Sequence, residues 1–276
     1  MASLAENVAR VISVFNVLKS KVKSYVAMND FLNPLKIEEY VNAIDDVFKC
    51  GEFNGKQSQY DEFWDAFQQN GSRTFYRHAF SGWGWTADTF KPKYNITPTD
   101  CARMFEYCRA FNLKEKLKES NVKLDLSNVT DVSEMFYYAF MGVGDNVIPD
   151  IWHKRITNAT NCFYVATGIK TIENFTVAEN CNVNMAFFRC DELENLTVGN
   201  TIGANGWDFL WSPKLSHDSI VNIIEHLSPA TTGLSIRFKK SAVNTAFGIN
   251  VDDETTYTEE WTNLINSKSN WTIAFA

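Results

Sequence analysis

The chain of 276 residues lacks the features that mark membrane insertion and export. It contains no run of about 18 apolar residues, so we expect no transmembrane helix and no insertion into a membrane. Its first residues offer no basic segment followed by an unbroken apolar stretch. We therefore expect no signal peptide, and if the protein acts outside a cell, we expect another route to carry it there.

Motifs of catalysis and cofactor binding are absent as well. The four histidines are dispersed, and none lies in an HExxH motif. The chain has neither a GxSxG motif, which presents a nucleophilic serine, nor a GxxxxGK[ST] loop, which holds phosphates. Acidic clusters such as Asp252-Asp253-Glu254 are typical of a solvated surface. We predict that the protein is not an enzyme, that it has no catalytic residue and that it binds no cofactor or metal.

Positive charge is scarce, since 26 Lys and Arg residues stand against 33 Asp and Glu residues and the net charge is −7. Nucleic-acid binding needs a concentrated basic surface. The densest basic run, residues 114–119, is interleaved with glutamate and is typical of a solvated helix face. We therefore expect no nucleic-acid partner.

Aromatic residues are abundant, with 21 Phe and 8 Trp, and Phe opens a short motif that repeats. In five places between residues 99 and 215, Phe is followed three residues later by Cys, Ala or Ser. The copies are Phe105-x-x-Cys108, Phe136-x-x-Ala139, Phe163-x-x-Ala166, Phe187-x-x-Cys190 and Phe209-x-x-Ser212. The Phe residues lie 31, 27, 24 and 22 residues apart, which is typical of repeat proteins. Tyr76-x-x-Ala79 is a candidate for a sixth, degenerate copy.

We interpret this repeat as a solenoid. Neighbouring repeats need a large apolar residue in register to form one continuous core, so we expect the Phe side chains to stack. The small residue lets the next backbone approach. Runs of strand character at 124–126, 175–177 and 196–198 supply short strands between the motifs. The expected fold is an α/β solenoid over residues 71–215.

The cysteines show neither CxxC spacing nor paired histidines; they are Cys50, Cys101, Cys108, Cys162, Cys181 and Cys190. Two of them, Cys108 and Cys190, take the small-residue position of the motif. We predict buried free thiols in a reducing compartment, with a disulfide or metal role as the less favoured alternative.

The segment 1–32 has a heptad pattern, in which apolar residues are separated alternately by four and three positions. They are Leu4, Val8, Val11, Phe15, Leu18, Val22 and Tyr25. Two interpretations remain open: the helix packs on the rest of the chain, or it forms an oligomerisation stalk or docks on a partner. We favour the second, and the width of the apolar face favours a homotrimer over a dimer.

Two further segments flank the repeats. Residues 33–70 are expected to form a helical connector, because amphipathic helical patterns follow one another there. Residues 216–276 are expected to form an α/β C-terminal cap, since a solenoid needs its terminal core covered. We expect helices at 216–227, 241–247 and 258–265 and strands at 234–238 and 271–275.

Residues 126–136 read Leu-Ser-x-Val-Thr-x-x-x-x-Met-Phe. This segment resembles the BspA-type leucine-rich repeat, whose family members are surface or adhesion proteins. Met104-Phe105 repeats the Met-Phe pair, whereas the later copies keep only the Phe. The resemblance implies a leucine-rich-repeat-like solenoid that acts in binding.

The arrangement of repeats behind a helical N-terminus is more loosely similar to proteins of tailed phages and of gut bacteria. It implies a virion or a bacterial cell surface, and the expected lack of a signal peptide favours the virion. We predict a non-enzymatic structural and adhesion protein, a tail or head appendage that attaches to a host surface. Other virion proteins and a host receptor or glycan are the expected partners, and a bacterial cell-surface adhesin is the alternative.

Aromatic residues in the expected longer loops are candidates for contact with a receptor. They are Trp83, Trp85 and Trp152. The alternative, which we favour, is that these Trp side chains close the core.

Overall fold

The computed structural model describes residues 68, 71, 74, 76, 77, 79, 80, 90–108, 112–141 and 145–276. The chain divides into two compact units, residues 1–67 and 68–276, and every described residue belongs to the second. The expected heptad helix at 1–32 lies outside the described residues, and so does the expected connector at 33–70 apart from Gln68. Both stay predictions, as do the proposed domain boundaries.

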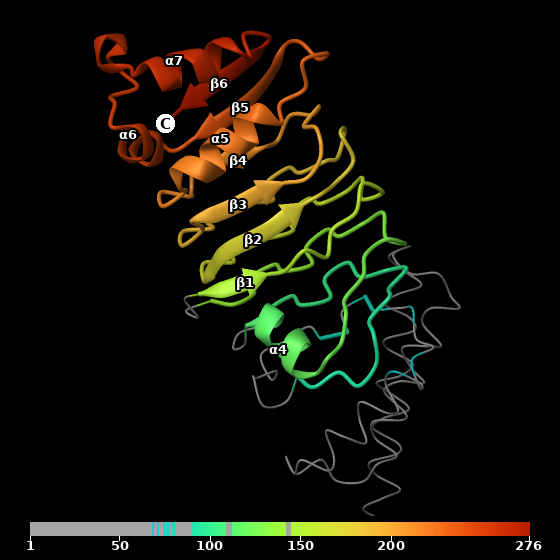
Figure 1. Ribbon diagram of the computed structural model, residues 1–276. Helices are drawn as coiled ribbons and strands as arrows, with labels where there is room; N and C mark the ends of the chain where they lie inside the picture. The colour runs from blue at the N-terminus through green and yellow to red at the C-terminus, as the bar shows by residue number, and fades with distance from the viewer. Residues whose placement is uncertain are drawn as a thin grey trace, which may run out of the picture. The chain divides into compact units, whose positions relative to one another are not determined.

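The first of two small parallel sheets contains β1 (Asn146–Ile148), β2 (Ile169–Phe175) and β3 (Asn195–Val198), side by side in that order (Figure 1). Ile148 lies opposite Ile172, which lies opposite Leu196. All three side chains are fully buried. One row of branched apolar side chains therefore crosses the sheet on its core side.

The second sheet contains β4 (Asp208–Phe209), β5 (Leu234–Phe238) and β6 (Trp271–Phe275), also parallel and in chain order. Parallel strands need a crossover connection between them. Helix α5 (His217–Glu225) supplies it between β4 and β5, and two further helices supply it between β5 and β6. This alternation of strand and helix makes the C-terminal part a mixed α/β structure.

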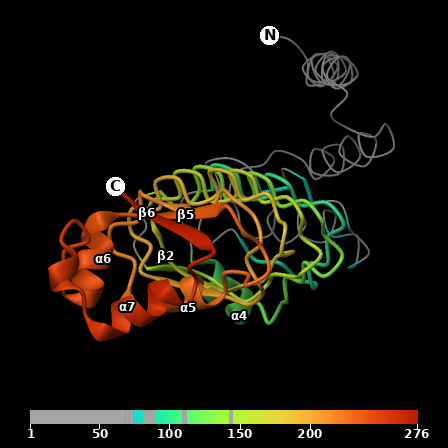
Figure 2. The ribbon, with the colours of Figure 1, turned by 90° about the horizontal axis from the view of Figure 1, so that it is seen from above.

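Local capping explains where the helices begin and end. The remaining helices are α4 (Leu113–Glu119), α6 (Lys240–Phe247), α7 (Glu259–Asn266) and the short 3-10 helix η2 (Glu254–Thr256). The Thr258 hydroxyl accepts the N–H of Trp261 at 3.2 Å and so caps α7. Helix α6 ends at Gly248, whose φ of 65° is left-handed and costs glycine little. Helix α5 contacts α6 and α7, and the three lie together at the C-terminal end (Figure 2).

The C-terminal elements agree with the sequence prediction. Strands β5 and β6 have the predicted bounds, and α5, α6 and α7 differ from the predicted helices by one or two residues at their ends. Their signals are local, because caps and short apolar patterns lie within each element. The predicted strand at 196–198 is also confirmed, as part of β3.

The repeated Phe residues stack in the core, as the motif predicted. The ring centroids of Phe105 and Phe136 are 5.4 Å apart, and those of Phe136 and Phe163 are 5.5 Å apart, with the rings within 6° of parallel. Phe187 and Phe209 continue the stack at 5.7 and 4.8 Å. All five rings are buried, and the small residues of the motif, from Cys108 to Ser212, are fully buried behind them.

The stack is longer than the motif indicated. Phe238 of β5 stacks on Phe209 at 5.6 Å, and Phe80 stacks on Phe105 at 5.4 Å. At the N-terminal end the ring in register is therefore Phe80, whereas Tyr76, the expected degenerate copy, lies beside it at a tilt. Each offset aromatic pair contributes ~0.5–1.5 kcal/mol beyond the burial of its area.

The predicted leucine-rich-repeat-like solenoid is wrong. Such a solenoid runs one parallel strand per repeat into a continuous sheet, whereas the described residues contain two separate three-stranded sheets. The predicted strand at 124–126 is reduced to a single bridge between Leu124 and Ile96. The predicted strand at 175–177 coincides only with the last residue of β2. The fold of the described residues is mixed α/β with two small parallel sheets and four α-helices.

The backbone of the repeated motif explains the difference. In the first four copies, the residues two positions before and two positions after the Phe have left-handed φ, for example Glu134 at 56° and Tyr138 at 52° around Phe136. Phe209 of the fifth copy lies in β4. Strand conformation requires negative φ, so the motif of the other four copies cannot be a strand. Instead it forms consecutive hydrogen-bonded turns, and its alternate N–H groups donate to the next copy, as from Phe136 to the Cys162 carbonyl at 2.7 Å. The copies thus join through turns.

A second residue position also repeats, which the motif of Phe and a small residue did not reveal. An Asp or Asn stands five residues before four of the Phe residues, and its side-chain oxygen accepts the N–H two residues further on. The four distances run from 2.8 to 3.3 Å, for Asp100, Asp131, Asn158 and Asn182. These side chains satisfy backbone donors where each motif begins, and so they fix the start of the turns.

Candidate binding surface

Six aromatic side chains outside the core form a continuous surface row, which we call the outer aromatic stripe. They are Tyr107, Tyr137, Tyr138, Tyr164, Phe188 and Trp211. Each contacts a neighbour: Tyr137 stacks on Tyr164 at 5.0 Å, and Tyr164 stacks on Phe188 at 4.7 Å. At one end of the row, Tyr107 contacts both Tyr137 and Tyr138. At the other end, the ring centroid of Trp211 lies 5.4 Å from that of Phe188.

The repeated motif places this stripe. Tyr137, Tyr164 and Phe188 each follow directly after a core Phe, so one residue of every pair faces inward and the next faces outward. Because the turns repeat in register, the outward rings stack as the inward rings do. The stripe side chains are half-buried, except for Trp211, which is 46 % exposed. The signal in the sequence was an aromatic residue directly after Phe in three of five copies.

Ionisation of Tyr137 in the stripe is suppressed. Partial burial raises the pKa of Tyr137, and the neighbouring phenols of Tyr138, Tyr107 and Tyr164 and the carboxylate of Glu134 raise this pKa further. A phenolate at Tyr137 would be disfavoured by desolvation and by repulsion from like charge. The Tyr137 phenol is therefore neutral near pH 7 and is both a hydrogen-bond donor and an acceptor.

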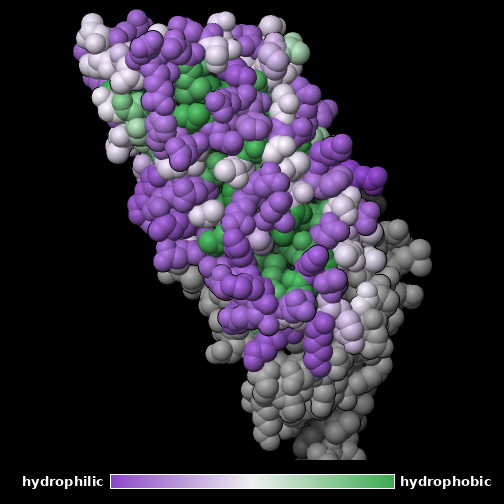
Figure 3. Space-filling view, in the orientation of Figure 1, coloured by the Kyte–Doolittle hydropathy of each residue, from purple (hydrophilic) through white to green (hydrophobic). Residues whose placement is uncertain are grey.

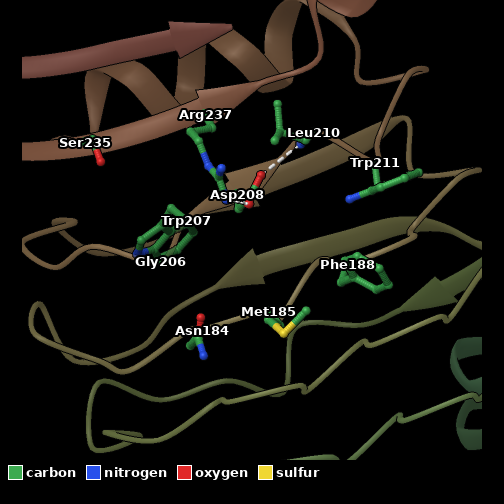
Figure 4. Close-up of a pocket in the computed structure, with 10 residues that line it drawn as sticks. All are labelled: Asn184, Met185, Phe188, Gly206, Trp207, Asp208, Leu210, Trp211, Ser235 and Arg237. Carbon is green, nitrogen blue, oxygen red and sulfur yellow. Dashed lines mark hydrogen bonds and ion pairs between the residues drawn. The ribbon is translucent and has the colours of Figure 1, made fainter. Parts of the chain in front are cut away.

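A surface pocket of about 550 Å³, which we call the β4–β5 pocket, lies at the Trp211 end of the stripe (Figure 4). Its walls come from the Phe187 and Phe209 motifs and from β5. The lining residues are Asn184, Met185, Phe188, Gly206, Trp207, Asp208, Leu210, Trp211, Ser235 and Arg237. Phe188 and Trp211 belong to both features, so the pocket and the stripe form one surface.

Polar groups in the pocket are held in place by paired strands. Asp208 of β4 lies opposite Arg237 of β5, and their side chains form an ion pair. The Asp208 carboxylate also accepts the N–H of Leu210 at 3.1 Å. These contacts position one anion and one cation side by side in the pocket, as Figure 4 shows.

Close backbone packing forms another wall of the pocket. Gly206 has a φ of +102°, and a β-carbon added there would lie 3.2 Å from the backbone nitrogen of Asn184. Glycine is therefore required both by its conformation and by the near approach of the two segments. Trp207, directly after it, is buried and packs between Phe175 and Phe187.

Comparison with protein-family models, curated proteins and solved structures finds no match. The resemblance of residues 126–136 to a BspA-type repeat therefore stays a prediction.

Trp152, one of the predicted contact residues, does not belong to this surface. Trp152 is buried and packs against Phe163 at 5.6 Å and Phe175 at 4.8 Å. The favoured alternative, that this Trp closes the core, is confirmed. Trp83 and Trp85 lie outside the described residues. The predicted contacts were tryptophans of long loops, whereas the outer aromatic stripe lies within the repeated motif itself.

A second hollow, of about 440 Å³, lies between α4 and the chain that leads from β1 to Trp152. Leu117, Val122 and Leu124 line it together with lysine and aspartate side chains. On the face drawn in Figure 3, hydrophilic residues predominate and hydrophobic atoms gather in separate areas. This hollow lacks the exposed aromatic rings that distinguish the β4–β5 pocket.

The cysteine thiols are structural in the described residues. All five described cysteines are buried and free, as predicted, and Cys50 lies outside the described part. Cys108 and Cys190 donate to the carbonyls of Phe80 and Phe163, each at 3.4 Å. Burial raises the pKa of both thiols, and it raises that of Cys181 to about 12. Neutral thiols are poor nucleophiles and poor metal ligands.

Neither a metal site nor a membrane span is found among the described residues. No group of three or more His, Cys, Asp and Glu side chains is close enough there to hold a metal ion. No helix in the described ranges is long and apolar enough to cross a membrane. His217 lies at the surface between Asp218 and Glu260, and these carboxylates raise its pKa.

Proposed function

We propose that the protein is a non-enzymatic attachment protein, which binds a surface through the outer aromatic stripe and the β4–β5 pocket. The observation that supports it is the continuity of the stripe, in which six half-buried or exposed rings end at a pocket. Tyr and Trp are enriched in binding interfaces, because each combines a rigid apolar body with a polar group.

The ion pair in the pocket fits this role. Asp208 and Arg237 are fixed by the strands that carry them, so they offer an oriented acceptor and donor without reorganisation. Preorganised groups lower the entropic cost of binding. A surface of stacked rings on hydrogen-bonded turns is likewise rigid before any ligand arrives.

The second part of the proposal concerns location. We propose that the protein is an appendage of a phage virion, with the bacterial cell surface as the alternative. Mass spectrometry of purified particles is expected to detect the chain in stoichiometric amounts. Its absence from particles together with its recovery in the surface fraction of uninfected cells would favour the alternative.

The attachment function is tested with fluorescently labelled protein on a panel of intact bacterial cells. We expect the double substitution Tyr137→Leu, Tyr164→Leu to lower saturable binding at least ~10-fold, because interface aromatics dominate binding energy. The matched control is Tyr257→Leu, since Tyr257 is a half-buried tyrosine of the C-terminal part that contacts Trp261 instead of the stripe. Equal binding by the stripe variant and the wild type would contradict the proposal.

A further inference from the structure

We propose that the β4–β5 pocket binds a neutral sugar residue of a glycan. This inference rests on the proposed function and deepens it, because it names the ligand class that the same surface recognises.

The aromatic wall suits the apolar face of a sugar ring. Trp211 is 46 % exposed and Met185 is 41 % exposed, and Phe188 lies with its ring centroid 5.4 Å from that of Trp211. A pyranose presents several C–H groups on one face, and polarised C–H groups are attracted to the negative face of an aromatic ring. The flexible Met185 side chain can adapt to the ring edge.

The polar groups suit the hydroxyl groups of a sugar. Asp208 accepts from Leu210 and from Arg237, which uses two of the roughly four acceptor positions of a carboxylate. Arg237 likewise has donors beyond the one that meets Asp208. A hydroxyl both donates and accepts, so neighbouring hydroxyls can bridge this pair in both directions.

Charge balance favours a neutral ligand. Among the described residues, Asp208 and Arg237 are the only charged side chains that line the pocket, and their charges cancel. An acidic sugar would have to approach the Asp208 carboxylate, and the net charge of −7 on the chain would oppose it further. A basic ligand would meet the guanidinium of Arg237.

Size and surroundings favour a glycan over a peptide. A volume of about 550 Å³ lies within the usual range for small-ligand sites, and the stripe extends from the pocket for further sugar residues. An extended peptide commonly adds to a sheet edge through main-chain hydrogen bonds. The edge strand here, β4, is only two residues long and offers little main chain to such a peptide.

The first experiment uses the full-length protein on an array of immobilised oligosaccharides that end in neutral or acidic sugars. We expect binding to a subset of the neutral saccharides, and a loss of at least ~10-fold in Trp211→Ala, because a central aromatic anchor is removed. Trp211→Phe keeps a ring and is expected to retain most of the binding. Because Trp211 is exposed, both variants are expected to fold, and circular dichroism checks this.

The second experiment changes specificity. Asp208→Asn keeps the oxygen that accepts from Leu210 but leaves Arg237 without its anionic partner, so the pocket gains a positive charge. We expect weaker binding to neutral saccharides and new binding to those that end in uronic or sialic acid. The matched control is Asp252→Asn, which breaks the exposed ion pair with Lys240 on α6 and makes the same change in net charge outside the pocket.

Three results would overturn the inference: no saccharide bound, acidic saccharides bound by the wild type, or an unchanged affinity in Trp211→Ala. The cell-binding assay distinguishes failure of the glycan inference from failure of the proposed attachment function. If attachment to cells persists after periodate oxidation of their glycans and disappears after protease treatment, the ligand is a protein and attachment still stands. If the wild type attaches to no cell and binds no saccharide, both proposals fail.

Discussion

Phe187 and Phe188 are adjacent residues of the same type, but they lie on opposite sides of the repeated motif. Phe187 is buried, and its ring contacts those of Phe163, Phe175 and Phe209 at 4.8 to 5.7 Å. Substitution of a core Phe by Ala removes the transfer free energy of the ring and leaves a cavity. We therefore expect Phe187→Ala to lower the free energy of unfolding by ~3–5 kcal/mol.

Phe188→Ala makes the same chemical change on the outside. The Phe188 ring is half-buried and has two aromatic neighbours in the stripe, Tyr164 and Trp211. Its loss removes one stacked pair and one edge contact and leaves no enclosed cavity. We expect a cost of about 1–1.5 kcal/mol, set by partial burial and by the ~0.5–1.5 kcal/mol of an aromatic pair.

Urea unfolding of the two full-length variants measures this difference directly. If the m values are unchanged, the urea concentration at the midpoint of unfolding should fall much further for Phe187→Ala than for Phe188→Ala. In the cell-binding assay, Phe188→Ala should lose more binding than Phe187→Ala, because only Phe188 lies on the proposed surface. Equal losses of stability would refute the reasoning, since the stripe would then be a second core and its exposure would give no support to a binding role.

Four further predictions follow from individual groups. Folding raises the pKa of Tyr137, so its stabilising contribution is complete below pH 10 and is lost as the pH rises through the raised pKa. In Tyr137→Phe, the free energy of unfolding should therefore depend less on pH in that alkaline range. The five described thiols should stay unreactive towards a thiol reagent at pH 8 and react on unfolding, since Cys181 for example has a pKa of about 12. Gly206→Ala should cost ~1–3 kcal/mol in urea unfolding through strain at positive φ and contact with Asn184. Light scattering should show a trimer for the full chain and a monomer for a truncated protein that begins at Lys36, and a monomeric full chain would contradict the predicted stalk.

The sequence predicted the stacked core well because its signal is simple. A Phe that recurs with a small residue three positions later requires only that apolar side chains be buried in register. Phe105, Phe136 and Phe163 stack as expected, and the C-terminal strands and helices lie where their local patterns placed them. Phe80 and Phe238 were missed as members of the stack. Phe80 has Trp83 in place of a small residue at the expected spacing, and Phe238, although Ser241 follows it at that spacing, lies outside the range 99–215 in which the motif recurs.

The solenoid prediction failed because apolar spacing does not report backbone conformation. Glu134, Tyr138 and Val165 are ordinary residues in left-handed conformation, a state that a side chain adopts only when surrounding contacts hold it there. Those contacts are the hydrogen bonds to the neighbouring copies, such as that from Tyr138 to the Tyr164 carbonyl at 2.8 Å. A one-dimensional pattern cannot distinguish such turns from short strands.

The sequence by itself determined that the repeated Phe residues form the core, since burial of a periodic apolar side chain depends little on the details of the backbone. Only the tertiary structure decided which residues form the surface. The left-handed turns bring successive outward rings into one stripe, and strand pairing places Arg237 beside Asp208, 29 residues earlier in the chain. Such contacts depend on the register between distant segments, which is set by hydrogen bonds and packing that exist only in the folded chain.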